Sequence, residues 1–306
     1  MDGVEDLVIN IVAAVIVFVC GVGARELLSF ARSWRGRVFW GRKLLRGRTV
    51  LFQGAFTRFN HLEPSSFIGI GDNHAVQQLA KTLGQLGARF DVAYASQISD
   101  GQHRENLILV GSDEVNSLTP SVFDKIGSGF RVNIDAMTIE DVATGDSYAS
   151  VWESEPMDGP ADRDLDESWF ISIASDGTRT ARRFLVDYGI LVRGQNPFAP
   201  QRALIVIAGL YGFGTWAGAT LPLDPGFLRR CAGLRNFECL YRVEVHQGQL
   251  LATSIVALRS LPEIPLSISH PLPRGLARLG IRFGSRLPYG PGGSPRAATT
   301  GGRRAG

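Results

Sequence analysis

Cysteine is scarce in this 306-residue chain, and the best-known catalytic motifs are missing from it. Three cysteines are too few for a disulfide framework or for a four-cysteine zinc site. The chain has no GxxxxGKS/T P-loop, no HExxH zinc motif, no GxSxG nucleophile motif and no EF-hand loop. It therefore lacks the signatures of those enzyme and calcium-binding classes, and we predict no metal site.

Acidic residues are nearly missing from two segments, 25–48 and 271–306, although the net charge of the whole chain is only +3. Residues 25–48 contain eight basic residues and one acidic residue, and residues 271–306 contain seven basic residues and no acidic residue. Residues 49–270 hold 17 basic and 25 acidic residues, a net charge of −8. Nucleic-acid binding needs clustered Lys and Arg on the folded surface, so we expect no nucleic-acid partner for this acidic central part.

Residues 7–24 form an apolar run of 18 residues in which Asn10 is the only clearly polar side chain. A helix of that length spans about 27 Å, enough for a hydrocarbon core. The acidic residues before the run argue against a cleaved signal peptide, and the bulky residues before Cys20 argue against a lipoprotein signal. A buried helix of a soluble domain is the remaining alternative. We predict a transmembrane anchor over residues 1–24.

Basic residues follow the apolar run and none precedes it. By the positive-inside rule the N-terminus lies outside and the main domain lies in the cytoplasm. Residues 25–48 interleave Trp34, Phe39 and Trp40 with basic residues, which suits a basic juxtamembrane segment on anionic lipid; nucleic-acid binding is the alternative. The sequence thus predicts a single-pass protein of the cell membrane, with the lipid bilayer as a partner.

Residues 49–262 alternate short apolar runs with helical patterns. The clearest helix is expected over residues 71–87, where Ala75, Leu79 and Leu83 recur at helical spacing. Tyr148–Trp152 and Trp169–Ser175 are expected to form two antiparallel strands around an acidic loop. The other strands are expected at 49–56, 66–70, 89–95, 106–110, 187–192, 203–208, 237–246 and 251–258, and the other helices at 119–127, 216–221 and 225–232.

These patterns predict an α/β fold, namely a three-layer Rossmann-like sheet over residues 49–262 with an antiparallel insertion, preceded by one N-terminal transmembrane helix. The continuous apolar run Asn106–Val110 is typical of a strand buried on both faces in a parallel sheet. Residues 263–306 are rich in Pro, Gly and Arg and have no acid after Glu263, so we predict a disordered basic tail.

Three predicted strands end in glycine-containing turns that lead into helices, at Ile68–Asn73, Val110–Asp113 and Ala208–Thr215. In a parallel α/β sheet such turns meet at the carboxyl ends of the strands, where glycine lets a ligand approach the backbone and helix N-termini favour anionic groups. Arg193, at the end of another predicted strand, could pair with a phosphate or carboxylate. We predict one ligand crevice formed by Gly71, Asp72, Asn73, Gly111, Ser112, Asp113, Arg193, Gly209, Tyr211, Gly212, Gly214 and Thr215.

The third turn presents Tyr211 and Phe213 beside the Thr215 hydroxyl, which suits a nucleobase or a sugar phosphate. Packing of both rings under the sheet is the alternative. The spacing is not GxGxxG with a later acid, so an NAD-binding fold is not supported, and the sequence identifies no cofactor. His74 is the only histidine in the crevice. No catalytic residue can be assigned, and in a hydrolase the nearest acids would be Asp72, Asp113, Glu114 and Asp187.

The order of NLILVG at 106–111, TP at 119–120, DYG at 187–189, NPF at 196–198 and AGLYGFGT at 208–215 resembles bacterial membrane-anchored Rossmann-like sensor domains, near the nucleotide-sensing and deoxyribosyltransferase-like families. The resemblance implies a nucleotide-derived ligand and identifies no catalytic residue. It favours a membrane-anchored cytoplasmic sensor that binds a nucleotide-like or other small anionic ligand. Such a sensor would signal through partners or through self-association as a homo-oligomer.

Two other hypotheses stay open at this point. One is a hydrolase of nucleotides or N-glycosidic bonds, which convergence of the crevice acids on His74 or Tyr211 would favour. The other is a structural membrane-associated scaffold, which burial of Tyr211 and Phe213 against the helix that follows the first turn would favour.

Overall fold

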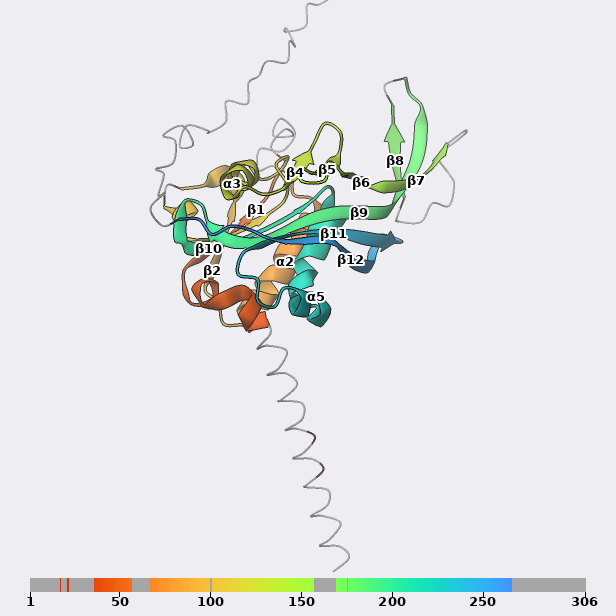
Figure 1. Cartoon of the computed structure of the whole chain (residues 1–306). Helices are drawn as coiled ribbons and strands as arrows, with labels where there is room; N and C mark the ends of the chain where they lie inside the picture. The colour runs from red at the N-terminus through yellow and green to blue at the C-terminus, as the bar shows by residue number, and fades with distance from the viewer. Residues whose placement is uncertain are drawn as a thin grey trace, which may run out of the picture. The chain divides into compact units, whose positions relative to one another are not determined.

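A computed structural model describes residues 17, 21, 36–56, 67–99, 101–156, 169–174 and 176–265 of the chain (Figure 1). The expected transmembrane anchor lies outside these residues except at Val17 and Gly21, and the expected basic tail lies outside them beyond Pro265. Among the residues that are described, no helix is both long enough and apolar enough to span a membrane.

Nine strands form one sheet, whose main path runs in the order β12-β11-β9-β10-β3-β1-β2. The neighbours β2, β1, β3 and β10 are parallel, and β9, β11 and β12 continue the sheet in antiparallel pairs. The strands of this path are β1 (Thr49–Gln53), β2 (Phe90–Tyr94), β3 (Asn106–Val110), β9 (Arg179–Asn196), β10 (Ala199–Gly209), β11 (Phe237–His246) and β12 (Gln249–Ser260).

The prediction of a three-layer Rossmann-like sheet behind a transmembrane helix is wrong for the described chain, because the sheet is mixed, the helices are few and none could cross a membrane. The error in the sheet arises at β9 and β10, which a Rossmann-like sheet would make parallel. They form a hairpin instead, since only Pro197 and Phe198 separate them. An apolar strand buried on both faces has the same composition whichever way its neighbour runs, so the sequence does not distinguish the two cases.

Helices pack on both faces of the sheet (Figure 1). One face carries α2 (Ile70–Gln85), α4 (Gly212–Thr220), α5 (Pro225–Arg230) and a helix over residues 36–46. The other face carries α3 (Leu118–Ile126) and a small sheet of β4 (Phe130–Asn133), β5 (Thr138–Asp141) and β6 (Ser147–Ala149). Short 3-10 turns span Ala95–Gln97, Gln102–Arg104 and Leu221–Leu223.

The face with α2 and α4 encloses the larger hydrophobic core. Ala75, Leu79 and Leu83 of α2 are fully buried there, together with Leu51 of β1 and Ile108 of β3. This burial confirms the helical periodicity that predicted α2, because the three residues lie on one face of the helix at spacings of four.

Phe39 and Trp40 belong to this core and not to a lipid surface. They are 4% and 2% exposed, and their rings meet edge to face with centroids 5.1 Å apart. Phe39 also lies near Phe227 of α5 and Phe237 of β11. The aromatic residues of the basic segment are therefore part of the folded domain at these two positions, whereas Trp34 lies outside the described residues.

The first part of β9, residues 179–186, extends past the main sheet and is flanked by β7 (Val151–Pro156) and β8 (Phe170–Ile173) (Figure 1). We call these three segments the arm. We expected β7 and β8 as an antiparallel pair, but each of them pairs with β9 instead. A strand as long as β9 can accept one partner on each edge, which the short apolar runs of β7 and β8 alone do not reveal.

The edge strand β12 is interrupted twice. Leu240 pairs with Ala257 while Tyr241 pairs with Ile255, so Val256 is an extra residue in the ladder. Leu251 is a second extra residue, opposite Glu244 and Val245. Each is a β-bulge, which bends and twists the strand that carries it.

The small sheet is fixed to the main sheet by a buried carboxylate. Glu238 of β11 is 3% exposed and accepts hydrogen bonds from the Ser128 hydroxyl at 2.7 Å and the Gly129 amide at 2.9 Å. Arg259 of β12 donates to Asp141 at 2.6 Å. Charge-assisted bonds of this kind hold β4 and the end of α3 in place.

Candidate ligand site at the carboxyl ends of the strands

The N-termini of α2 and α4 meet at two of the predicted glycines. A methyl group added to Gly71 would overlap the backbone carbonyl group of Gly212, so the two helices approach more closely here than any side chain allows. The first and third turns of the predicted crevice therefore do come together. Their glycines serve helix packing at this contact, because the space that a ligand would need is filled by backbone.

Asp72 and Thr215 connect the same two helices by a side-chain hydrogen bond. Asp72 is 5% exposed and Thr215 is 2% exposed, and the Thr215 hydroxyl also accepts the Gly209 amide at 3.1 Å. Burial raises the pKa of Asp72 from 3.8 to about 6; the Thr215 bond lowers it and the charge of Glu114 raises it. The crevice therefore contains a buried carboxyl group that changes its charge near neutral pH.

The side chain of Asp187 on β9 lies at the N-terminus of α4. It is fully buried, and its Oδ2 accepts the Gly214 amide at 2.7 Å. Its Oδ1 accepts the Ser150 hydroxyl and the Tyr188 amide, both at 2.8 Å. Burial raises its pKa to about 6 against these hydrogen bonds. A carboxylate of the protein thus takes the place at this helix N-terminus where the sequence predicts an anionic ligand.

Tyr211 leads into α4 from the third turn and packs among aromatic rings of the arm. Its ring centroid lies 5.0 Å from that of Trp152 on β7 and 4.7 Å from that of Phe184 on β9. Phe213 lies 5.2 Å from Phe184, and Phe170 of β8 lies 5.2 Å from Trp152. We call these five residues the aromatic cluster. None of them is buried, and Phe170 is 42% exposed.

Sequence reasoning missed Trp152, Phe170 and Phe184 as site residues. They come from strands whose pairing with β9 was not predicted, and no spacing in the sequence connects them to Tyr211. Trp152 and Phe184 are direct cross-strand partners, so a correct register for β7 and β9 would have placed both rings beside the third turn.

The second turn, after β3, contributes a tight bend. Gly111 has a φ of +103°, and Ser112 is 6% exposed. Asp113 follows the bend and lines a pocket on the opposite face of the sheet, beside α3. The charge of Glu114 raises the pKa of Asp72, of Asp113 and of Tyr211, so it acts on groups of both the first and the second turn. Of the remaining predicted residues, Asn73 is exposed on α2.

Arg193 does not join the crevice. Because β9 runs antiparallel to β10, it leads away from the carboxyl ends of β3 and β10, and Arg193 pairs with Ile205, four residues before Gly209. There Arg193 donates to the carbonyl oxygens of Leu234 and Arg235, both at 2.9 Å, and its guanidinium lies 5.8 Å from the Phe39 ring centroid. Its placement follows directly from the reversed direction of the strand.

Neither His74 nor the cysteines form a reactive centre with these acids. His74 stacks on Trp216 of α4 with centroids 4.6 Å apart, and Cys231 and Cys239 are buried free thiols. Within the described ranges, no group of three or more His, Cys, Asp or Glu side chains could hold a metal ion.

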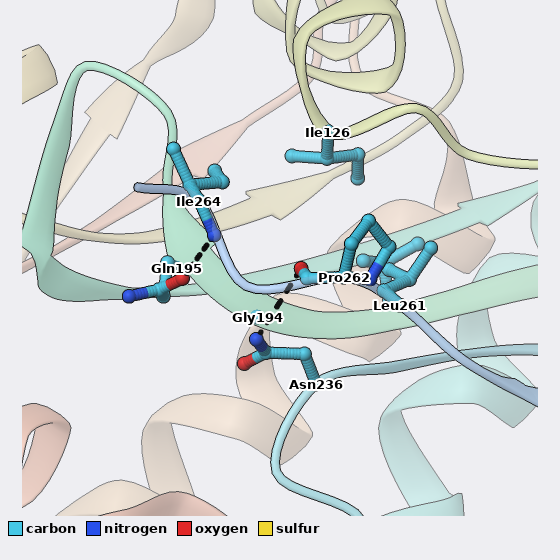
Figure 2. Close-up of a pocket in the computed structure, with 8 residues that line it drawn as sticks. Ile126, Gly194, Gln195, Asn236, Leu261, Pro262 and Ile264 are labelled. Atoms are coloured by element: carbon cyan, nitrogen blue, oxygen red, sulfur yellow. Dashed lines mark hydrogen bonds between the residues drawn. The ribbon is translucent and has the colours of Figure 1, made fainter. Parts of the chain in front are cut away.

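A pocket at the opposite edge is too small for a ligand (Figure 2). It lies where residues 261–264 cross β9, next to Ile126 of α3, and it has a volume of about 10 Å³, room for a single water at most. The Ile264 amide donates to Gln195 Oε1 at 2.6 Å, and Asn236 donates to the Pro262 carbonyl at 3.5 Å. These bonds hold residues 261–264 against β9, and the pocket is a packing gap under this segment.

Comparison with known proteins adds no assignment. No family model, curated protein or solved structure matches this chain.

Asp72→Asn is expected to change the pH dependence of stability. Since the pKa of Asp72 is raised from 3.8 to about 6, the folded chain keeps a proton that the unfolded chain has released within that window. The protonated Asp72 therefore stabilises the folded wild-type protein at low pH, and this contribution to the free energy of unfolding is lost as the pH rises from 3.8 to about 6. The variant carries no ionisable group at this position, so its free energy of unfolding lacks this decrease. Urea unfolding of both proteins between pH 4 and pH 7 measures the difference. Parallel curves would contradict the expectation.

Proposed function

We propose that this domain binds a small nucleoside- or nucleotide-like ligand at the carboxyl ends of β3 and β10, with the flat ring of the ligand against the aromatic cluster. The supporting observation is the cluster itself, in which partly exposed rings from three strands, from the β10–α4 turn and from α4 lie together, with Trp152 and Phe184 in contact with Tyr211. Stacking on aromatic side chains is how proteins hold nucleobases without needing a sequence-specific pattern of hydrogen bonds.

The charges beside the cluster suit such a ligand. Glu114 lies within electrostatic reach of Tyr211 and Asp72, and its carboxylate can accept hydrogen bonds from sugar hydroxyl or base amino groups. Arg182 of the arm is exposed and also within electrostatic reach of Tyr211. Because Asp187 occupies the N-terminus of α4, Arg182 is the group that we expect to contact a phosphate, if the ligand carries one.

The two other hypotheses receive less support. A hydrolase that uses two carboxylates would need both of them free in the crevice. Asp187 is committed to three hydrogen bonds, Asp72 is bonded to Thr215 and Asp113 lines a pocket on the opposite face, so only Glu114 remains of the four acids named above. A scaffold would bury Tyr211 and Phe213 against α2. Both rings are only partly buried and lie against Phe184 of the arm, and Phe213 also packs against the core that contains α2.

Tyr211→Ala is expected to weaken nucleoside binding by about tenfold or more, because it removes one stacking surface. The probes are adenosine, guanosine and their 5′-monophosphates, and the measurement is isothermal titration of the full chain with thermal unfolding alongside. Arg182→Ala should weaken the monophosphates and leave the nucleosides unchanged.

The matched control is Tyr94→Ala. Tyr94 is 41% exposed at the end of β2, away from the arm, so its loss removes the same side chain without touching the cluster. Equal affinity of the wild-type protein and Tyr211→Ala for every probe, or equal losses in the two tyrosine variants, would contradict the proposal.

A further inference from the structure

A second pocket lies on the other face of the sheet, between the helix α3 and the strand β4. Its volume is about 70 Å³, room for several waters. Phe123, Pro120 and Val132 give it apolar walls, and its polar lining comes from Asp113, Thr119, Asp124 and Arg131. This size suits a small polar head on a short alkyl stem and excludes a nucleoside. The pocket is therefore separate from the site proposed above.

Asp113 contributes the uncommitted polar atom of this pocket. Among the described residues, its Oδ1 is shielded from solvent and has no hydrogen-bond partner. The carboxyl group interacts with its own backbone amide, with the backbone amide of Glu114 and with the charge of Glu114. Most buried carboxylate oxygens have a donor, so an orphaned one beside an open pocket marks a place where a bound donor would be stabilising.

The cation that lines the pocket is already engaged. Arg131 donates from Nη1 to the carbonyl oxygens of Ser128 at 2.8 Å and Phe130 at 3.2 Å. Its Nη2 lies 3.5 Å from Asp124, whose side chain is 74% exposed. With Arg131 held in this way and with Glu114 adding negative charge next to Asp113, the potential in the pocket favours a cation over an anion.

We propose that the pocket between α3 and β4 binds a small organic cation, an alkylammonium or alkylguanidinium, whose charged head bonds to Asp113 and whose stem lies along Phe123 and Val132. The head donates to the Asp113 carboxylate that lines the pocket, and the stem covers apolar wall. The Thr119 hydroxyl, which donates to the Gly111 carbonyl at 3.0 Å, keeps an oxygen lone pair as a further acceptor for the head.

Amide chemical-shift titration of the full chain with n-propylammonium and n-propylguanidinium tests this directly. We expect shifts in Asp113, Thr119 and Phe123 that saturate at millimolar probe, and no saturable shift with acetate or with 1-propanol, which has the same stem without charge. Burial raises the pKa of Asp113, so the affinity should fall as the pH is lowered and the carboxylate is protonated.

The variants separate a role in binding from a role in folding. Asp113→Asn keeps the shape and should weaken both cations by about tenfold or more, as expected for the loss of a charge-assisted bond. Asp124→Asn removes an exposed charge from the same pocket and should weaken them by less than about threefold. Equal affinity in Asp113→Asn, acetate binding, or absence of saturable shifts in the wild-type protein would overturn the proposal. Failure of nucleoside binding at the aromatic cluster would leave these outcomes unchanged, since the two sites lie on opposite faces.

Discussion

Replacing Asp187 with alanine is expected to lower the free energy of unfolding by about 3 kcal/mol, which is among the largest effects of any single change in this domain. The substitution leaves the Gly214 and Tyr188 amides and the Ser150 hydroxyl without their acceptor in a fully buried place. These groups belong to the first turn of α4, to β9 and to the residue that precedes β7 of the arm. The loss should therefore loosen the arm as well as α4.

Thermal and urea unfolding measure this effect, and the midpoint of thermal unfolding should fall by about 6–12 °C for a domain of this size. The stability of Asp187→Asn should lie between that of the wild-type protein and that of Asp187→Ala, because an amide group can accept hydrogen bonds only through its oxygen and not through its nitrogen. The control is Asp91→Ala, which removes a carboxylate that is 57% exposed and bonded only to Arg48 at the surface. It should change stability by less than about 1 kcal/mol. A loss of that size in Asp187→Ala would contradict the structural role assigned to Asp187.

Gly71→Ala is expected to destabilise the domain by about 3 kcal/mol, because the new methyl group would overlap the backbone of Gly212 and push α2 away from α4. The same displacement would separate Asp72 from Thr215. Nucleoside binding by the folded variant should therefore also weaken, if the site lies where we propose.

Gly84→Ala is the matched control in the same helix. A methyl group there meets nothing within 4 Å, so only the helix propensity changes, and the variant should be more stable than the wild type by up to about 1 kcal/mol. Urea unfolding of the two variants should give changes of opposite sign. Changes of the same sign and size would show that the Gly71–Gly212 contact does not control helix packing.

Much of the secondary structure follows from local patterns in the sequence. The spacing of Leu79 and Leu83 predicts α2, the apolar run Asn106–Val110 predicts β3, and the expected strands at 237–246 and 251–258 correspond to β11 and β12. These features depend on residues close in the chain, where periodicity and turn chemistry are informative.

The parts that failed depend on which strands become neighbours. The direction of β9 decides that Arg193 lies away from the carboxyl ends of the strands, and the pairing of β7 with β9 decides that Trp152 meets Tyr211. The prediction that Phe39 and Trp40 contact lipid failed for another reason, because both rings are buried in the core. Alternation of aromatic and basic residues suits both a lipid surface and a helix with one buried face. In each case long-range packing selected between arrangements that the local sequence permits equally.

The two bulges of β12 have a consequence for how this protein behaves at high concentration. Among the described residues β12 has no partner on its outer side, and it has no charged residue before Arg259. A long uncharged edge of this kind would normally invite another chain to extend the sheet and aggregate. Because Leu251 and Val256 interrupt the ladder, the regular run between them is confined to Ala252–Ile255. The open end of a nine-stranded sheet is thereby kept from acting as a template for fibril growth.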